Sequence, residues 1–108
     1  MDIINEYLNR TRKVETMYDG AMYECIRPYI LCKDGFTISV QASEYHYCTP
    51  RINGAVKYET VELGFPNIED SLIIDYAEER EKPTDTVYGY VPVRIVNELV
   101  EKHGGVIN

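Results

Sequence analysis

The chain has no tryptophan, two histidines and three cysteines, and it lacks both a long apolar run and a cluster of basic residues. No apolar run approaches the roughly 20 residues that a bilayer span needs, and Met1 is followed by polar residues rather than by an export signal. Cys25, Cys32 and Cys48 form no CxxC pair, and an odd number of thiols cannot all pair within one chain. We therefore expect reduced thiols, a cytoplasmic location in a host cell and no membrane association.

The scarcity of histidine and of basic residues excludes further classes. His46 and His103 do not show the spacing of zinc ligands, so we expect no metal and no cofactor. Lys and Arg number 11 against 18 for Asp and Glu, which gives a net charge of −7. Direct nucleic-acid binding needs clustered cations and is disfavoured. The acidic balance is typical of plain solubility, and it also fits a protein that imitates nucleic acid in a basic groove.

The chain is nevertheless rich in tyrosine. Its 108 residues suffice for one core, so we expect a single domain over residues 1–108, and they include ten tyrosines. Tyrosine combines a large contact area with a polar tip and is favoured where proteins meet partners. This bias predicts a homo-oligomer or a recognition surface. The alternative is that several tyrosines, such as Tyr7 and Tyr76, only pack helices onto a sheet.

The first half of the chain predicts a helix and a hairpin. Helical spacing of apolar residues predicts a helix over residues 2–14, capped by Asp2. A strand over residues 22–32 is interrupted by Pro28, and an alternating strand follows over residues 36–43. A three-residue loop, Lys33 to a left-handed Gly35, joins them, because it gathers one apolar face. This register sets Cys32 opposite Phe36, Ile30 opposite Ile38, and Ile26 opposite Ala42.

The second half predicts two more strands and one or two helices. A strand over residues 55–65 has Val61, Leu63 and Phe65 on one face and Tyr58, Thr60 and Glu62 on the other. Asn67 is predicted to cap a helix through Tyr76, with a strand at residues 72–74 as the rival. A strand at residues 86–91, where Gly89 permits close approach of a neighbour, precedes a helix over residues 93–103. The fold class is α+β: a mostly antiparallel sheet of four to five strands covered by two to three helices.

The densest group of functional side chains is Glu44, His46, Cys48 and Arg51. Continued alternation would bury Glu44, so we expect a bulge or a change of direction near Ser43 or Glu44. His46 and Cys48 on an extended chain lie about 7 Å apart, beyond hydrogen-bond reach. A cysteine nucleophile would therefore need a turn here, and we predict no catalytic residue and a non-enzymatic protein.

Ligand binding fits the same stretch better. Two tyrosines can stack on a base, a planar guanidinium can hold a phosphate, and polar side chains at the end of the strand can read polar edges. The alternative is a wet sheet face with surface tyrosines. The predicted ligand-binding residues are Gln41, Ser43, Tyr45, His46, Tyr47 and Arg51.

Three segments carry a resemblance to a known group: SVQASEYHYCTPR (residues 39–51), ELGFPN (residues 62–67) and TVYGYVPVRIVNELVEKHGG (residues 86–105). They resemble short proteins of bacteriophages and prophages of Gram-positive bacteria, a group without an assigned activity. The resemblance implies a small phage accessory protein of the anti-defence type, and it transfers no functional residue. We therefore expect a homo-oligomeric protein that sequesters a small anionic or nucleotide ligand. The alternative is an acidic, anti-CRISPR-like inhibitor that blocks a host nuclease or another host defence protein.

Overall fold

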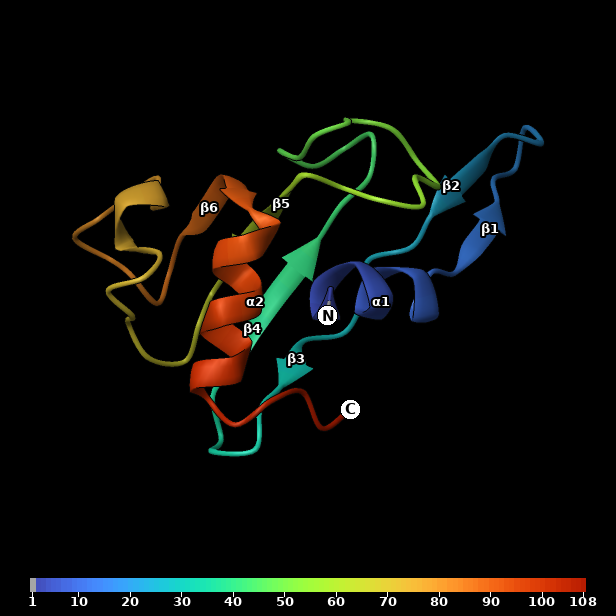
Figure 1. Cartoon of the computed structure of the whole chain (residues 1–108). Coiled ribbons are helices and arrows are strands. Elements are labelled where there is room, and N and C mark those ends of the chain that lie inside the picture. Colours follow the sequence, from blue (N-terminus) through green and yellow to red (C-terminus); the bar gives the residue numbers. More distant parts are fainter. Residues whose placement is uncertain (1) are drawn as a thin grey trace.

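The computed structural model describes residues 2–108 and contains two antiparallel sheets and two α-helices (Figure 1). A four-stranded sheet has the order β3-β4-β5-β6, and β1 and β2 form a separate two-stranded hairpin. This arrangement confirms the predicted α+β class. The elements are α1 (Ile3–Arg10), β1 (Val14–Thr16), β2 (Met22–Glu24), β3 (Ile30–Leu31), β4 (Thr37–Gln41), β5 (Thr60–Gly64), the 3-10 helix η1 (Ile74–Tyr76), β6 (Val87–Pro92) and α2 (Val93–Lys102).

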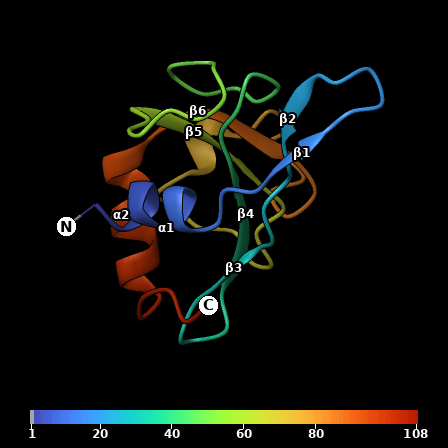
Figure 2. The ribbon, with the colours of Figure 1, turned by 90° about the vertical axis from the view of Figure 1, so that its right-hand side faces the viewer.

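Both α-helices lie on the same side of β4, and the core fills the space between them and the sheet (Figure 2). The Asn97 side chain on α2 accepts a hydrogen bond from the Ile4 amide at 2.9 Å and so joins the two helices. The alternating face of β4 points into this core because its apolar residues occur at every second position. The fully buried aliphatic side chains are Ile4, Leu8, Ile30, Ile38, Val40, Ala42, Val61, Leu63, Ile73, Val91, Val96, Leu99 and Val100.

The β3–β4 hairpin has the predicted loop and register near its turn. Ile30 lies opposite Ile38, the Cys32 amide donates to the Phe36 carbonyl at 2.8 Å, and Gly35 has a φ of 96°. The predicted pairing of Ile26 with Ala42 is wrong, since Ile26 is 77% exposed. Residues 25–29 form no strand, because Pro28 interrupts the ladder and the buried Arg27 turns inward instead.

The N-terminal third differs from the prediction in its element lengths. Asp2 caps α1 as expected by accepting a hydrogen bond from the Asn5 amide at 3.1 Å. The helix ends at Arg10 rather than near Val14, and the Thr11 hydroxyl closes its last turn by donating to the Tyr7 carbonyl. The chain then enters the β1–β2 hairpin, so the expected strand over residues 22–32 is two short strands, β2 and β3.

The predicted strand over residues 55–65 is regular only at Thr60–Gly64. The sequence predicts Tyr58 on the face opposite Val61 and Leu63, but it is 1% exposed, because residues 55–59 form a loop that turns it into the core. Phe65 was expected beside Leu63, yet it adopts a left-handed φ of 52° and is exposed. The strand alternation therefore ends one residue before Phe65.

Residues 67–76 form neither the predicted helix nor the rival strand. Asn67 caps no helix; its side chain accepts from the Thr37 amide and donates to the Gly35 carbonyl, both at 2.9 Å. One 3-10 turn follows at Ile74–Tyr76. At the C-terminal end, α2 matches the prediction closely and is followed by Gly104, which has a φ of 94°.

Candidate functional site

The predicted cluster is one compact loop at the end of β4. After Gln41 the chain turns, and the His46 amide donates to the Ser43 carbonyl at 3.2 Å. The Ser43 hydroxyl lies 2.7 Å from His46 Nδ1 and also accepts from the Tyr45 amide at 3.1 Å. The change of direction expected near Ser43 is confirmed, and it keeps Glu44 at the surface.

Gln41 and Ser43 are not on an exposed face, which corrects the prediction of their position. They are 4% and 1% exposed, respectively. The Gln41 side chain accepts from the Arg27 amide at 2.9 Å and donates to the Arg27 carbonyl at 2.8 Å. It therefore fastens residues 25–29 to β4. A buried polar side chain requires such partners. The side-chain oxygen and nitrogen of Gln41 are both already hydrogen-bonded to the backbone of Arg27.

Three of the predicted residues remain at the surface, and two of them, Tyr47 and Arg51, are in contact. Tyr45 and Tyr47 are exposed, and the Arg51 guanidinium carbon lies 5.2 Å from the centre of the Tyr47 ring. Arg51 Nε donates to the Glu44 carbonyl at 3.0 Å, which fixes the guanidinium over the ring.

Tyr90 joins this group from β6, and sequence reasoning missed it. Its ring centre lies 5.7 Å from that of Tyr47, at an interplanar angle of 32°. We refer to Tyr45, Tyr47, Arg51 and Tyr90 as the tyrosine face.

A β-bulge positions Tyr90. Val61 pairs with Val91 and Leu63 with Tyr88, so Gly89 and Tyr90 together oppose Glu62. Tyr90 takes a left-handed φ of 53°, a conformation that costs a tyrosine about 1 kcal/mol or more. The bulge turns the Tyr90 side chain outward. The strained backbone conformation of Tyr90 persists because the surrounding structure enforces it. The only sign of this bulge in the sequence is Gly89, the glycine within the segment VYGY.

Close packing against Gly89 holds the loop on β6. A Cβ atom at Gly89 would lie 3.3 Å from the Tyr47 Cβ, and the Tyr47 carbonyl accepts from the Tyr90 amide at 3.0 Å. On the other side, the Tyr47 amide donates to the Glu62 carboxylate at 3.1 Å. The expectation that Gly89 permits close approach of a neighbour is confirmed.

The thiol and imidazole in the loop have structural partners. Cys48 is buried, its Sγ donates to the Ser43 carbonyl at 3.2 Å, and burial raises the pKa of its thiol. Burial also lowers the pKa of His46, and its Nδ1 is engaged by Ser43. Within residues 2–108, no hydrogen bond joins the Cys48 thiol to the His46 ring. A nucleophile needs an accessible thiolate next to a base, and neither condition is met here.

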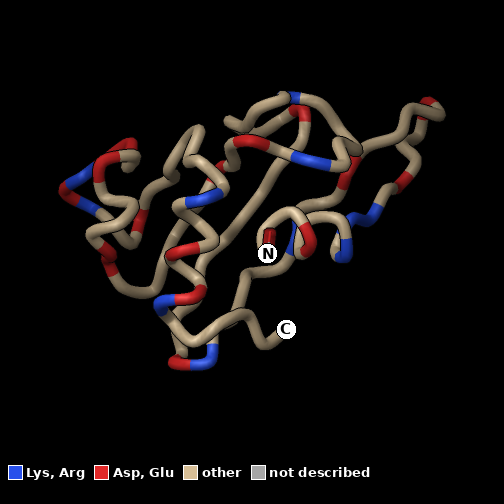
Figure 3. Tube along the Cα trace, in the orientation of Figure 1, with Lys and Arg blue, Asp and Glu red and all other residues tan. Residues whose placement is uncertain are grey.

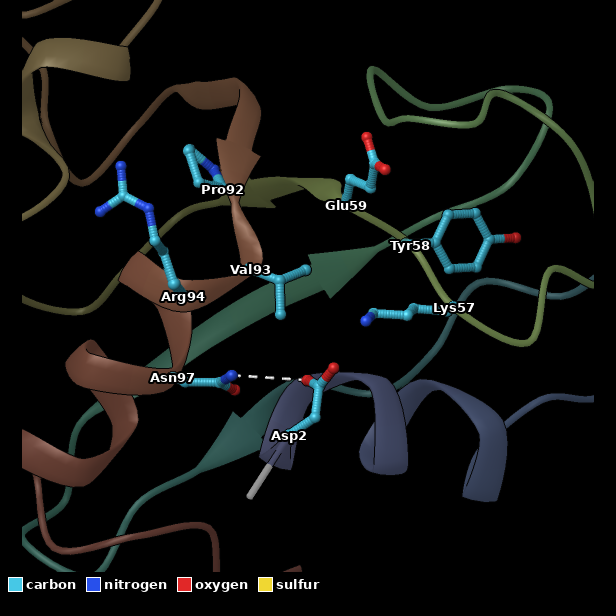
Figure 4. Close-up of a pocket in the computed structure, with 8 residues that line it drawn as sticks. All are labelled: Asp2, Lys57, Tyr58, Glu59, Pro92, Val93, Arg94 and Asn97. Carbon is cyan, nitrogen blue, oxygen red and sulfur yellow. Dashed lines mark hydrogen bonds between the residues drawn. The ribbon is translucent and has the colours of Figure 1, made fainter.

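A separate cavity of about 490 Å³ lies where the N-termini of α1 and α2 approach each other (Figure 4). Lys57 and Arg94 reach it from opposite sides, and Asp2 and Glu59 supply two carboxylates. The Asp2 side chain already accepts hydrogen bonds from the Asn5 amide and the Asn97 side chain. Two cations face two carboxylates, so the formal charge of the lining side chains is zero.

A second open concavity, of about 530 Å³, lies between the β1–β2 hairpin and Tyr45. Its lining includes Met17, Tyr18 and Tyr23 from the hairpin. Unlike the cavity at the helix N-termini, it is lined by no charged side chain. An open aromatic hollow of this kind suits a side chain of a partner better than a free phosphate.

Residues 2–108 contain no group of three or more His, Cys, Asp or Glu side chains placed to share a metal ion. Over the same range, no helix combines the length and the apolar character that a bilayer crossing requires. Comparisons of the chain with protein-family models, with curated proteins and with solved structures found no match, so the proposed function depends on this geometry.

Proposed function

We propose that this chain is a non-enzymatic binding protein that acts by occupying a surface on another protein through the tyrosine face. The observation that carries the proposal is the surface group of Tyr45, Tyr47, Arg51 and Tyr90, in which Tyr47 packs closely against Gly89. Tyrosine and arginine dominate the centres of protein interfaces, where a few residues supply most of the binding energy. The loop is already ordered, which reduces the entropy lost on binding.

The net charge of −7 favours a basic partner. Acidic and basic positions are interspersed along the chain, including the segment 69–82 (Figure 3). Asp75, for example, pairs with Arg80 at 2.9 Å, and the buried Asp70 pairs with Lys102 at 3.0 Å. Such a surface steers association with a basic protein but does not copy a regular row of phosphates. Together with the resemblance to phage accessory proteins, this supports a host nuclease or another defence protein as the target.

A small anionic ligand is the second candidate, and Arg51 is the observation that favours it. Only Nε of its guanidinium is hydrogen-bonded within residues 2–108, and the guanidinium carbon lies over the ring of Tyr47. The two terminal nitrogens form a fork that suits a phosphate. Tyr47 and Tyr90 present ring faces on which a base could stack. In this second candidate function, a nucleotide binds at the residues that the sequence predicts, which include Tyr45, His46, Tyr47 and Arg51.

Quantitative affinity capture tests the leading proposal. Tagged protein is expressed in a Gram-positive bacterium, and stoichiometric partners are measured for the wild type, Tyr47→Ser and Tyr29→Ser. Tyr47 and Tyr29 are both 43% exposed, so Tyr29→Ser is a matched control outside the tyrosine face. We expect Tyr47→Ser to reduce capture about tenfold or more and Tyr29→Ser to leave it unchanged. Equal capture by both variants would contradict the proposal.

Thermal shift separates the second candidate. A panel of cyclic nucleotides that raises the Tm of the wild type, but not of Arg51→Ala, would favour the small ligand. Dissociation of a captured partner by added salt would favour the protein-directed function, because complementary surface charges are screened. No shift with any nucleotide would remove the small-ligand candidate.

A further inference from the structure

The β1–β2 hairpin projects from the body of the molecule as an arm (Figures 1 and 2). The arm comprises residues 12–25, and its two strands form a sheet that is separate from the four-stranded one. A two-stranded hairpin alone is marginally stable in water, and this arm exposes apolar side chains. Met22 is 67% exposed, and Val14, Met17 and Tyr18 are exposed as well. The arm is joined to the body through Arg12 and Glu24 at its base, and its apolar side chains remain exposed.

The hydrogen bonds within the arm determine which main-chain groups point outward. Lys13 pairs with Cys25 through an amide-to-carbonyl bond of 2.8 Å, and Met17 pairs with Ala21 through one of 2.6 Å. Hydrogen-bonded pairs alternate with non-bonded pairs in an antiparallel ladder. Val14 lies opposite Glu24, next to the bonded Lys13–Cys25 pair, so Val14 and Glu24 form a non-bonded pair. The Val14 amide and carbonyl therefore point away from β2. All three residues of β1 are exposed, so its outer edge is open.

The chain's own segments cover both outer strands of the four-stranded sheet. At β3, the Ile107 amide donates to the Leu31 carbonyl at 2.9 Å, and the Lys33 amide donates to the Gly105 carbonyl at 3.1 Å. At β6, the Glu78 amide donates to the Val87 carbonyl at 2.9 Å. Proteins cover or block edges in this way to avoid pairing with other chains. Among residues 2–108, no other segment hydrogen-bonds to the outer edge of β1 or of β2. β1 is exposed at all three positions, whereas Glu24 of β2 is buried, so β1 is the more accessible edge.

The edge of β1 is complementary to itself. In an antiparallel pairing of two copies about Val14, Lys13 of one copy lies opposite Glu15 of the other, and the reciprocal pair forms as well. The Lys13–Glu15 ion pair within one chain is exposed and 3.3 Å long, so it can exchange for a pair between copies. Glu15 meets Lys13 through Oε1, while its Oε2 accepts a hydrogen bond from the Tyr23 hydroxyl at 2.9 Å. The arm holds two basic and three acidic residues of a chain whose net charge is −7. The arm itself is therefore nearly neutral, and two arms repel each other less than the net charge of the whole chain would suggest.

We propose that β1 pairs with β1 of a second copy of this chain, antiparallel and centred on Val14, to make a four-stranded sheet across a twofold axis. The contact is isologous, because the same edge serves both copies. It locates a homodimer on the arm. It does not rest on the proposed function, because no residue of the tyrosine face belongs to the arm. Tyr45 lines a concavity with Met17, Tyr18 and Tyr23 of the arm, but Val14 does not line it.

Sedimentation velocity over a concentration series tests the dimer. We expect the wild type to dimerise at up to about 100 μM and Val14→Pro to be monomeric, because proline removes an outward donor and no bond within the arm. Ile68→Asp, at an exposed apolar position outside the arm, should leave the dimer intact. A wild type that remains monomeric, or a Val14→Pro protein that still dimerises, would overturn the proposal. If the wild type is monomeric, the partner of the open β1 edge would be a strand of another protein rather than a second copy.

Charge exchange tests the register. Lys13→Glu alone and Glu15→Lys alone place like charges opposite each other and should raise the dimer dissociation constant about tenfold each. The double variant Lys13→Glu/Glu15→Lys restores opposite charges and should regain dimerisation close to that of the wild type. Circular dichroism of each variant verifies that the chain is folded. A double variant as weak as the single ones, with an unchanged spectrum, would overturn the pairing about Val14.

Discussion

Tyr47 packs directly against the backbone of Gly89, at a spacing that would admit a side chain only if Tyr47 shifted by a few tenths of an ångström. A Cβ atom at Gly89 would lie 3.3 Å from the Tyr47 Cβ, and the Tyr47 carbonyl is held by the Tyr90 amide at 3.0 Å. The loop that carries the tyrosine face is thus fixed to β6 at the bulge. This contact links fold stability to the proposed binding surface.

Gly89→Ala should lower the free energy of unfolding by about 1 kcal/mol, because Tyr47 cannot move without losing its bond to Tyr90. Gly64→Ala is the matched control, since a Cβ atom there meets Val87 and Ser39 at ordinary distances of 3.7 and 3.8 Å. It should raise stability by about 0.5 kcal/mol by restricting the unfolded chain. Urea denaturation measures both. The opposite order of the two variants would contradict the packing.

Alkylation should distinguish the three thiols. Burial raises the pKa of Cys32 to about 11 and also raises that of Cys48, whereas Cys25 is only half-buried. At neutral pH, iodoacetamide should modify Cys25 in the folded protein and should modify Cys32 and Cys48 only after denaturation. Mass spectrometry after digestion gives the rate at each site. Rapid alkylation of Cys48 in the folded protein would return cysteine-based catalysis to consideration.

His46 should make the protein less stable in mild acid. Burial lowers its pKa below the ordinary 6.5, so the folded state favours the neutral ring. Between 6.5 and that lowered value the unfolded chain binds more protons, and stability falls as the pH decreases. His46→Asn keeps a polar partner for Ser43 and removes this titration. Its urea midpoint should therefore change less than that of the wild type between about pH 7.5 and about pH 5. Equal changes would contradict the account of His46.

The buried Glu24 should be essential for anchoring the arm. Its carboxylate accepts from Arg12 Nε at 2.6 Å and from the Gly54 amide at 3.1 Å, and it lies 3.5 Å from the buried Arg27 guanidinium. Glu24→Gln leaves Arg27 without its counter-charge and should cost about 3 kcal/mol.

Asp75→Asn is the control for Glu24→Gln. It breaks an exposed ion pair with Arg80 and should change stability by less than about 1 kcal/mol. Urea denaturation compares the two variants. Similar losses would show that the Glu24 pair is not a buried anchor.

Local signals predicted the β3–β4 hairpin well. Asp34–Gly35 and the alternation from Phe36 to Ala42 are properties of neighbouring residues, so loop, register and buried face could all be inferred. The β1–β2 hairpin could not be inferred in the same way. Its strands are only three residues long, and β1 is exposed throughout, which removes the alternation that marks a half-buried strand.

The candidate site was predicted only in part because two of its features depend on distant segments. Gln41 is buried because the irregular residues around Arg27 need its side chain as a partner, 14 positions away. Tyr90 joins Tyr47 because a bulge in β6 opposes Glu62 on β5. Neither relationship has a periodic signature in the sequence. The surface positions of Tyr45, Tyr47 and Arg51 could be predicted from the sequence, because the strand alternation visibly ends at Ser43.

The dissociation constant of the complex with a captured partner tests the central claim most directly. Isothermal titration calorimetry would compare the wild type, Tyr47→Ser and Tyr29→Ser with the same purified partner. The account predicts an increase of about tenfold or more for Tyr47→Ser and less than about twofold for Tyr29→Ser, because Tyr47 lies at the centre of the tyrosine face. An unchanged dissociation constant for a folded Tyr47→Ser variant would contradict it.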